Sequence, residues 1–302
     1  VLIAIVRHLT QKDAPLAVFD THAGAGLYRL DSDYANTSGE AAQGYLRLVK
    51  GGAAVTTPGA VAGRSQAKSA DTTECPQPWL RQAPRGGARK LGNGPAFSCE
   101  GALAPVLQDY LDMVATFNAK GSCKVYPGSP FIIQRLLRDR DKLKLFELHP
   151  TDAKTLSANI AQLDAGRQVT VSREDGFEAL KKFLPPPQRR ALVLCDPSYE
   201  IKNDYQRVSA TMADAMARFA TGTYAIWYPI IPRPEAHDLP RKLKSLANKV
   251  GKPWLNASLS VKSSKMLVDT TSGTQTRPGL PASGIFVINP PHTLKAALQL
   301  AL

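Results

Sequence analysis

The segment Asp196-Pro-Ser-Tyr places a carboxylate, a rigid turn and an aromatic ring directly after the apolar run Ala191–Cys195. A short apolar run bounded by turn residues is typical of a buried strand, so Asp196 is expected at the end of that strand. This combination suits an exocyclic adenine amine, whose lone pair is delocalised into the ring. Asp196 and the Pro197 carbonyl can accept its two N–H groups and draw the nitrogen towards tetrahedral geometry. The Tyr199 ring can stack on a base turned out of a nucleic acid.

Three more carboxylates occupy equivalent places along the chain. Asp20 ends the first apolar run, Glu147 ends the second, and Asp175 follows the third. A single such residue is usually a helix cap or a solvated side chain, but four at successive strand ends favour a shared site. An acid at the end of the second strand suits hydrogen bonds to ribose hydroxyls, as in other nucleoside-binding folds. We therefore expect these residues and Asp196 to converge.

A glycine turn follows Asp20 in the segment Thr21-His-Ala-Gly-Ala-Gly. Glycine lets the backbone approach a ligand closely, so this turn is a candidate binding loop. It is weak evidence for a dinucleotide-binding loop, because Arg29 stands where the third glycine of that motif would be.

The elements that must position these residues alternate along the chain. Strands are expected at 16–19, 143–147, 168–172, 191–195 and 223–228, with a late hairpin of strands at 255–261 and 284–289. Helices are expected at 1–10, 37–50, 103–117, 131–137, 153–163, 175–183 and 205–219, and the segment 27–30 is also expected to be helical. Alternation of this kind predicts an α/β fold with a doubly wound, mostly parallel sheet, whose strand-to-helix loops meet at one edge.

Residues 51–101 differ in character from the rest. Gly and Pro make up about a quarter of this stretch, and it has no sustained period, so we interpret it as a mobile surface insertion. A folded zinc- or RNA-binding module is the alternative. The predicted organisation is the start of one domain at 1–50, this insertion, a helical insertion at 102–122, and the remainder of the domain at 123–302. We also expect the first helix to lack its N-terminal lead.

Composition excludes several classes of protein. The 302 residues carry 38 Lys and Arg against 25 Asp and Glu, a formal net charge of +13. This excess favours a polyanionic partner, with a basic protein lacking such a partner as the alternative. No apolar run reaches the ~18 residues of a membrane span. The 4 cysteines form no CxxC pair, so we predict no metal site and a reducing, cytoplasmic setting.

The Asp196 motif resembles the Asp-Pro-Pro-Tyr signature of adenine-N6 methyltransferases. The chain further resembles the RlmJ-type methyltransferases of 23S ribosomal RNA in Asp20-Thr-His-Ala-Gly-Ala-Gly, Tyr126-Pro-Gly-Ser-Pro, Glu147-Leu-His-Pro, Asp175-Gly-Phe, Ala220-Thr-Gly-Thr-Tyr-Ala-Ile-Trp-Tyr-Pro and Ala282-Ser-Gly-Ile-Phe-Val-Ile-Asn-Pro-Pro. The resemblance implies a class I S-adenosylmethionine (SAM) fold with a small helical insertion, and N6-methylation of one adenine in that RNA by a monomer. It also implies cofactor contacts at His22, Ser129, Glu147, Asp175, Gly176 and Asp196.

The chain departs from the family in three ways. We expect a segment rich in His, Ala, Gly and Asn, which precedes the family's first helix, to be missing. The insertion is longer, and Ser198 replaces the second proline, which loosens the turn. The similar run Asn289-Pro-Pro-His lacks an aromatic residue, and we interpret it as structural. Taken alone, His22 is equally typical of a capping residue and Ser129 of a turn. The alternatives are an inactive relative that binds SAM or RNA, a DNA adenine methyltransferase and, more remotely, a nicotinamide oxidoreductase.

Overall fold

The computed structural model describes residues 1–31, 103–119, 122–260, 267–268, 275–276 and 280–301. The predicted helix at 37–50 and the predicted insertion at 51–101 lie outside these residues. Helices are α1 (Leu2–Leu9), α5 (Pro105–Ala115), α6 (Ser129–Leu136), α7 (Pro150–Ala161), α8 (Gly176–Phe183), α9 (Lys202–Arg218), α10 (Pro234–Lys249) and α11 (Leu294–Gln299), with a 3-10 turn at Gly166–Gln168. Strands are β1 (Ala17–Asp20), β2 (Leu27–Arg29), β3 (Val125–Pro127), β4 (Lys142–Phe146), β5 (Val169–Ser172), β6 (Ala191–Cys195), β7 (Thr223–Ile230), β8 (Trp254–Ser260), β9 (Leu267–Val268), β10 (Gln275–Thr276) and β11 (Ala282–Ile288).

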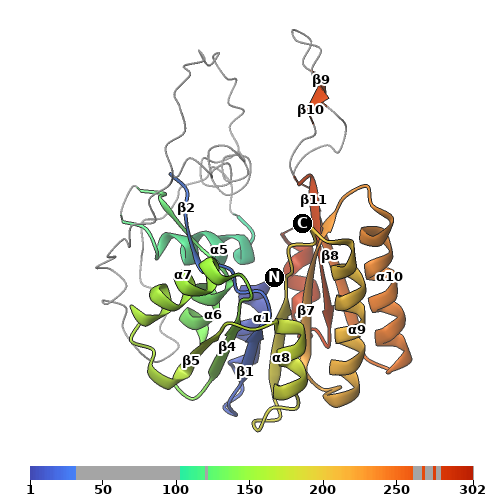
Figure 1. The fold of residues 1–302 in the computed structure, drawn as a ribbon, viewed down its shortest axis with the longest axis horizontal. Helices are drawn as coiled ribbons and strands as arrows, with labels where there is room; N and C mark the ends of the chain where they lie inside the picture. Colours follow the sequence, from blue (N-terminus) through green and yellow to red (C-terminus); the bar gives the residue numbers. More distant parts are fainter. Residues whose placement is uncertain (32–102, 120–121, 261–266, 269–274, 277–279, 302) are drawn as a thin grey trace.

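The main sheet has seven strands in the order β5-β4-β1-β6-β7-β11-β8 (Figure 1). The five strands from β5 to β7 are mutually parallel. Strand β11 enters between β7 and β8 and pairs antiparallel with both. The predicted doubly wound, mostly parallel sheet is therefore confirmed, and so is the antiparallel pairing of the two late strands.

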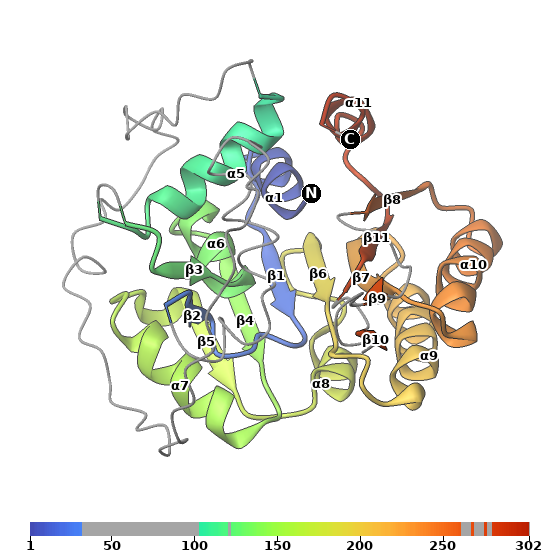
Figure 2. The same cartoon turned by 90° about the horizontal axis from the view of Figure 1, so that it is seen from above.

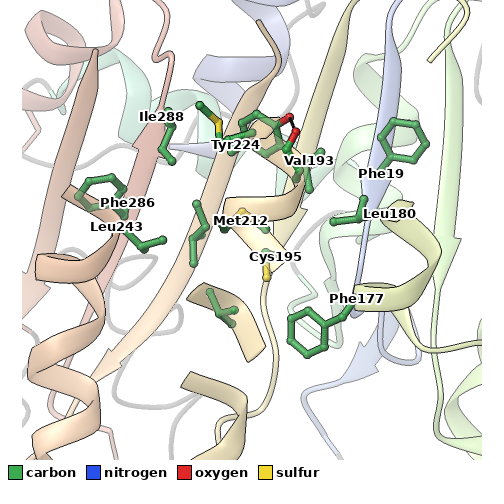
Figure 3. Packing of buried hydrophobic residues seen from close by; sticks show 14 of the residues in the cluster. Phe19, Phe177, Leu180, Val193, Cys195, Met212, Tyr224, Leu243, Phe286 and Ile288 are labelled. Atoms are coloured by element: carbon green, nitrogen blue, oxygen red, sulfur yellow. Dashed lines mark hydrogen bonds between the residues drawn. The ribbon is translucent and has the colours of Figure 1, made fainter. Parts of the chain in front are cut away.

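Helices cover both faces of this sheet, and each face has its own hydrophobic core. Successive side chains of β1 point to opposite faces, so Phe19 belongs to one core and Val18 to the other. Helices α8, α9 and α10 cover the first face, where Phe19 packs near Leu180 (Figure 3). Helices α1, α5, α6, α7 and α11 contribute to the core on the second face (Figure 2). This double cover leaves the strand ends as the edges where a ligand can enter.

The segment after the glycine turn is not helical, contrary to the prediction for 27–30. It forms β2, which pairs antiparallel with β3 and is extended by a bond from Leu30 N to Lys124 O of 2.8 Å. Sequence reasoning missed this pairing because the partner strand lies about a hundred residues away along the chain. The predicted helix at 103–117 is present as α5, which ends at Ala115. Met113 of this helix and Phe117, which follows it, belong to the core of the second face.

Asn289 forms hydrogen bonds at the edge of the sheet that lies opposite the four acidic residues. Its Nδ2 donates to Ala220 O at 2.9 Å and to Gly222 O at 2.7 Å, next to the start of β7. This confirms the structural interpretation of Asn289-Pro-Pro-His. Within the described ranges, no helix has both the length and the apolar character needed to cross a membrane.

Candidate active site

The four predicted carboxylates lie at the carboxyl ends of four neighbouring parallel strands. Asp20 ends β1, Glu147 follows β4, Asp175 follows β5 and Asp196 follows β6. The strand order β5-β4-β1-β6 makes these strands neighbours, as the sequence predicted. Charge interactions link Asp20 with both Glu147 and Asp196. The edge is therefore an acidic surface suited to a cation.

Asp20 is the most deeply placed of these acids. It is fully buried, and its Oδ2 accepts a hydrogen bond of 2.7 Å from Ser129 Oγ at the start of α6. Burial raises the pKa of Asp20 from 3.8 to about 6, the Ser129 bond opposes this, and the charge of Glu147 adds to it. Ser129 thus lies in the site, in contact with Asp20 across more than a hundred residues of sequence. A positive ligand charge near Asp20 would relieve the cost of ionising it.

The glycine loop after β1 is held rigidly against its surroundings. Gly24 N donates to Glu147 Oε2 at 2.8 Å, and Gly128 N donates to Gly26 O at 2.7 Å. Gly24 adopts a φ of +59°, a conformation that side-chain-bearing residues rarely take. The other oxygen of Glu147, Oε1, accepts from His149 N at 2.8 Å. Each Glu147 oxygen keeps a second lone pair, so a ribose contact there is compatible with these bonds.

His22 is an uncharged side chain beside the glycine loop. Its Nδ1 lies 2.7 Å from Thr21 Oγ1, and that hydroxyl donates to Leu194 O at 3.1 Å. Because the hydroxyl proton is used there, Nδ1 carries the histidine proton and Nε2 keeps its lone pair. Burial lowers the pKa of His22 to about 4, with Arg207 also lowering it and Asp175 opposing. His22 is therefore uncharged at neutral pH.

Asp175 and Gly176 begin α8 beneath the end of β1. Asp175 is the helix N-cap and accepts from Phe177 N at 2.9 Å, while its other oxygen accepts from Arg207. A Cβ on Gly176 would lie 2.0 Å from the Thr21 carbonyl oxygen, so only glycine allows this approach. The sequence motif Asp-Gly-Phe thus has a packing reason, and its role in cofactor binding stays a prediction.

Asp196 and Pro197 each offer a hydrogen-bond acceptor that is not used within the described part of the protein. Among the described residues, neither the Asp196 carboxylate nor the Pro197 carbonyl accepts a hydrogen bond. Surrounding protein raises the pKa of Asp196 from 3.8 to about 7, and the charge of Asp20 adds to this. The residue as a whole is exposed, so solvent access opposes the shift. A carboxylate in this state is well placed to accept both a hydrogen bond and a proton.

Tyr199 lies elsewhere than its predicted stacking role requires. Its side chain is 2 % exposed, and its ring packs 4.7 Å from Tyr205 and 6.2 Å from Trp227. The hydroxyl donates to Trp227 O at 2.6 Å, and the backbone has a φ of +55°. The structure therefore does not support stacking of Tyr199 on a base, because both the ring and its hydroxyl are taken up by the core. Tyr199 instead anchors the turn.

Two side chains near the site were not found from the sequence. Arg207 of α9 contacts Asp175. The Tyr28 hydroxyl lies against the glycine loop, 2.3 Å from the position that a Cβ on Gly24 would take. The charges of Asp20 and Asp196 contribute to raising the pKa of Tyr28 to about 12, after burial as the main cause. No sequence motif marked either residue, since one is on a helix face and the other on an unexpected strand.

The fold and the site together define a class of protein. A parallel sheet with one antiparallel late strand, and acids at the ends of its first strands, is the architecture of class I SAM-dependent methyltransferases. A solved protein of Legionella pneumophila str. Philadelphia 1, described as family DUF519, has the same fold, with a TM-score of 0.67 and 24% identity over 100% of this chain and 86% of that one.

The sequence comparisons define the family. The family model described as RsmJ, "Ribosomal RNA large subunit methyltransferase D, RlmJ", matches residues 13–56 and 83–302, and the chain belongs to this family. The curated protein "Ribosomal RNA large subunit methyltransferase J" of Escherichia coli (strain K12) is 34% identical over 98% of this chain and 82% of that protein. Its counterpart in Haemophilus influenzae (strain ATCC 51907 / DSM 11121 / KW20 / Rd) is 32% identical over 99% of this chain and 84% of that protein.

Proposed function

We propose that the chain methylates N6 of one adenine in 23S ribosomal RNA, with SAM as the methyl donor. Membership of the RlmJ family supports the reaction class and the RNA. The observation that carries the mechanism is the pair of free acceptors at Asp196 and Pro197. An amine with two N–H groups is the ligand that satisfies both.

The residues at this edge fit SAM. The cofactor carries an ammonium and a sulfonium, and when bound it supplies an activated methyl group on that sulfonium. Asp20 and Asp196 both have raised pKa values, so it costs free energy to ionise both carboxyl groups in the empty site. A bound cation would lower that cost. Glu147 would accept hydrogen bonds from the ribose hydroxyls, and Asp175 and Gly176, where α8 begins, would receive the adenine ring.

Asp196 and Pro197 orient the target amine. Their two oxygens accept its two N–H groups, so the nitrogen lone pair leaves conjugation with the ring and points towards the methyl group. When the methyl carbon exchanges its bond to sulfur for a bond to N6, the sulfur would leave as a neutral thioether and the nitrogen would become positively charged. Asp196 then accepts the proton that this nitrogen loses. A raised pKa makes Asp196 a better proton acceptor than an ordinary carboxylate.

Tyr199 and its neighbours keep this turn in place. The hydroxyl bond to Trp227 O and the contact with Tyr205 fix the residue that ends the turn. A non-glycine residue at positive φ persists only where its surroundings hold it, and such positions are frequent in active sites. We therefore assign Tyr199 a positioning role in place of base stacking.

The partner and setting follow from the charge and the chemistry. The net charge of +13 supplies attraction to RNA phosphates without sequence readout. The target is single-stranded or opened RNA, because N6 of a paired adenine is engaged in the duplex. We propose that the protein acts as a monomer in the cytoplasm, where ribosomal RNA is made.

The test compares Asp196→Asn and Asp196→Ala with Asp214→Asn. Asp214 is a matched control because it is a carboxylate on α9 whose exposed ion pair with Arg218 is remote from the turn. We expect the Asp196 variants to fold and to lose about 10²–10⁴-fold in methyl-transfer rate, and the control to retain it. Near-normal transfer by a folded Asp196→Ala protein would contradict the mechanism. SAM binding without transfer by the wild type would indicate the inactive relative.

A further inference from the structure

Arg207 lies on α9, the helix that follows the turn at 196–199, and contacts Asp175 at the end of the loop after β5. Its Nη2 donates to Asp175 Oδ2, and its guanidinium lies over the Phe177 ring, 4.4 Å from the ring centroid. Arginine is suited to this double contact because its planar group binds a carboxylate and stacks on an aromatic face at once. One side chain therefore contacts both Asp175, which ends this loop, and Phe177, in the first turn of α8.

Both oxygens of Asp175 are engaged in this arrangement. Oδ1 accepts from Phe177 N at 2.9 Å, and Oδ2 accepts from Arg207. Burial alone would raise the pKa of Asp175, but the bond from Arg207 and then that from Phe177 N bring it below its usual value. Asp175 is thus a fixed anion at neutral pH, with one orientation.

The effect of Arg207 extends to the glycine loop through Phe177. The Phe177 ring meets the His22 ring edge-on, with centroids 4.7 Å apart. Phe177 is itself 2 % exposed, so its position is set by these contacts and the core beneath it (Figure 3). Arg207, Phe177 and His22 therefore form a continuous chain of contacts from α9 to the loop after β1.

Helix α9, which carries Arg207, packs against the turn after β6. Two residues earlier on this helix, Tyr205 packs 4.7 Å from Tyr199, which anchors the turn after β6. The ion pair of Arg218 with Asp214, by contrast, links two residues of α9 near the end of the helix. Arg207 is thus placed differently from an ordinary surface arginine.

We propose that Arg207 is a positioning residue for the adenosine half of SAM. It fixes Asp175 and Phe177 in the conformation that receives the adenine ring, and touches neither the methyl group nor the target amine. This inference rests on the proposed function, since it assigns the loop at Asp175 to adenine. It predicts an effect on cofactor affinity that exceeds the effect on the rate of transfer.

The test measures binding of S-adenosylhomocysteine and of adenosine by calorimetry or competition. We expect Arg207→Gln to weaken both ligands by the same factor, at least about tenfold, because both contain the adenine ring. At saturating SAM the methyl-transfer rate should change by less than about threefold, whereas KM for SAM should rise with the binding constant. Arg207→Lys should recover part of the affinity by restoring the charge. Arg218→Gln is the matched control and should bind like the wild type.

A double-mutant cycle separates this role from a general loss of structure. If Arg207 acts through Asp175, the losses from Asp175→Asn and Arg207→Gln should be less than additive, while the thermal midpoint of Arg207→Gln stays close to that of the control. Unchanged S-adenosylhomocysteine affinity in Arg207→Gln, or strictly additive losses, would overturn the proposal. A wild-type protein that binds neither SAM nor S-adenosylhomocysteine would instead contradict the proposed function.

Discussion

The pH dependence of cofactor binding follows from two acids at the site. Burial places the pKa of Asp20 at about 6, and surrounding protein with the charge of Asp20 places that of Asp196 at about 7. Binding of a sulfonium cation favours the ionised form of both. SAM affinity should therefore rise with pH through this range and level off above it, with protons released on binding.

The magnitude can be worked from Asp20 alone. At pH 5, one unit below a pKa of about 6, roughly a tenth of Asp20 is ionised, so SAM affinity should be about tenfold lower than at pH 7. Asp196 adds to this effect, by less than its pKa suggests, because the residue is exposed. S-adenosylhomocysteine has a neutral sulfur, so its affinity should change less over the same range.

The assay is calorimetric titration of both ligands between pH 5 and pH 8 in two buffers of different ionisation enthalpy. The difference between buffers reports the protons released, which should be greater for SAM than for S-adenosylhomocysteine. Asp20→Asn should remove most of the pH dependence. A SAM affinity that is flat across this range, or one that has the same slope as that of S-adenosylhomocysteine, would refute the electrostatic reasoning.

The same acid predicts how stability of the ligand-free protein depends on pH. The folded protein binds the Asp20 proton more tightly than the unfolded chain, since the pKa rises from 3.8 to about 6. The contribution of Asp20 is therefore fully present below pH 4 and is lost as pH rises through 6, by ~3 kcal/mol. Chemical unfolding of the wild type and of Asp20→Asn at pH 5 and pH 7 measures the last part of this loss, about 1.3 kcal/mol, and SAM should stabilise most at the higher pH.

Three substitutions test individual parts of the site. Gly176→Ala should lower the free energy of unfolding by ~1–3 kcal/mol in urea titration and weaken SAM binding, because its Cβ meets the Thr21 carbonyl oxygen; unchanged stability would contradict the packing account. Tyr199→Phe leaves the Trp227 carbonyl without its donor and should cost ~1–3 kcal/mol by the same measurement, with the transfer rate falling more than SAM affinity; equal losses would argue against a role in the turn. Ser198→Pro should raise the transfer rate at unchanged SAM affinity by stiffening the turn, and slower transfer would show that Ser198 itself works in the site.

The sequence predicted the sheet because its central strand β6 is a continuous apolar run and the other parallel strands are short, mostly apolar or alternating segments. Each run ends at a turn residue or an acid, so the places of Asp20, Glu147 and Asp196 at one edge followed from the fold class alone. The segment 27–30 was predicted wrongly, since its conformation depends on pairing with β3 and not on local preference. Local patterns therefore located the ends of strands but not the short strand outside the main sheet.

The environment of side chains was harder to predict than their position. Tyr199 follows the strand β6 as predicted, yet its ring points into the core and not towards a base, because it packs against Tyr205 and Trp227. Arg207 carried no motif, and its contacts with Asp175 and Phe177 arise only when α8 and α9 pack side by side. Spacing in sequence does not encode such contacts between helices.

The central claim is tested most directly by the methylated product itself. The protein should be incubated with labelled SAM and unmodified 23S ribosomal RNA made by transcription, and the digested nucleosides should be separated by mass. The account predicts N6-methyladenosine at one position per RNA, with none formed on DNA of the same sequence and none by Asp196→Asn. Methyl on a different nucleoside, on the DNA in preference to the RNA, or on neither despite bound SAM would contradict it.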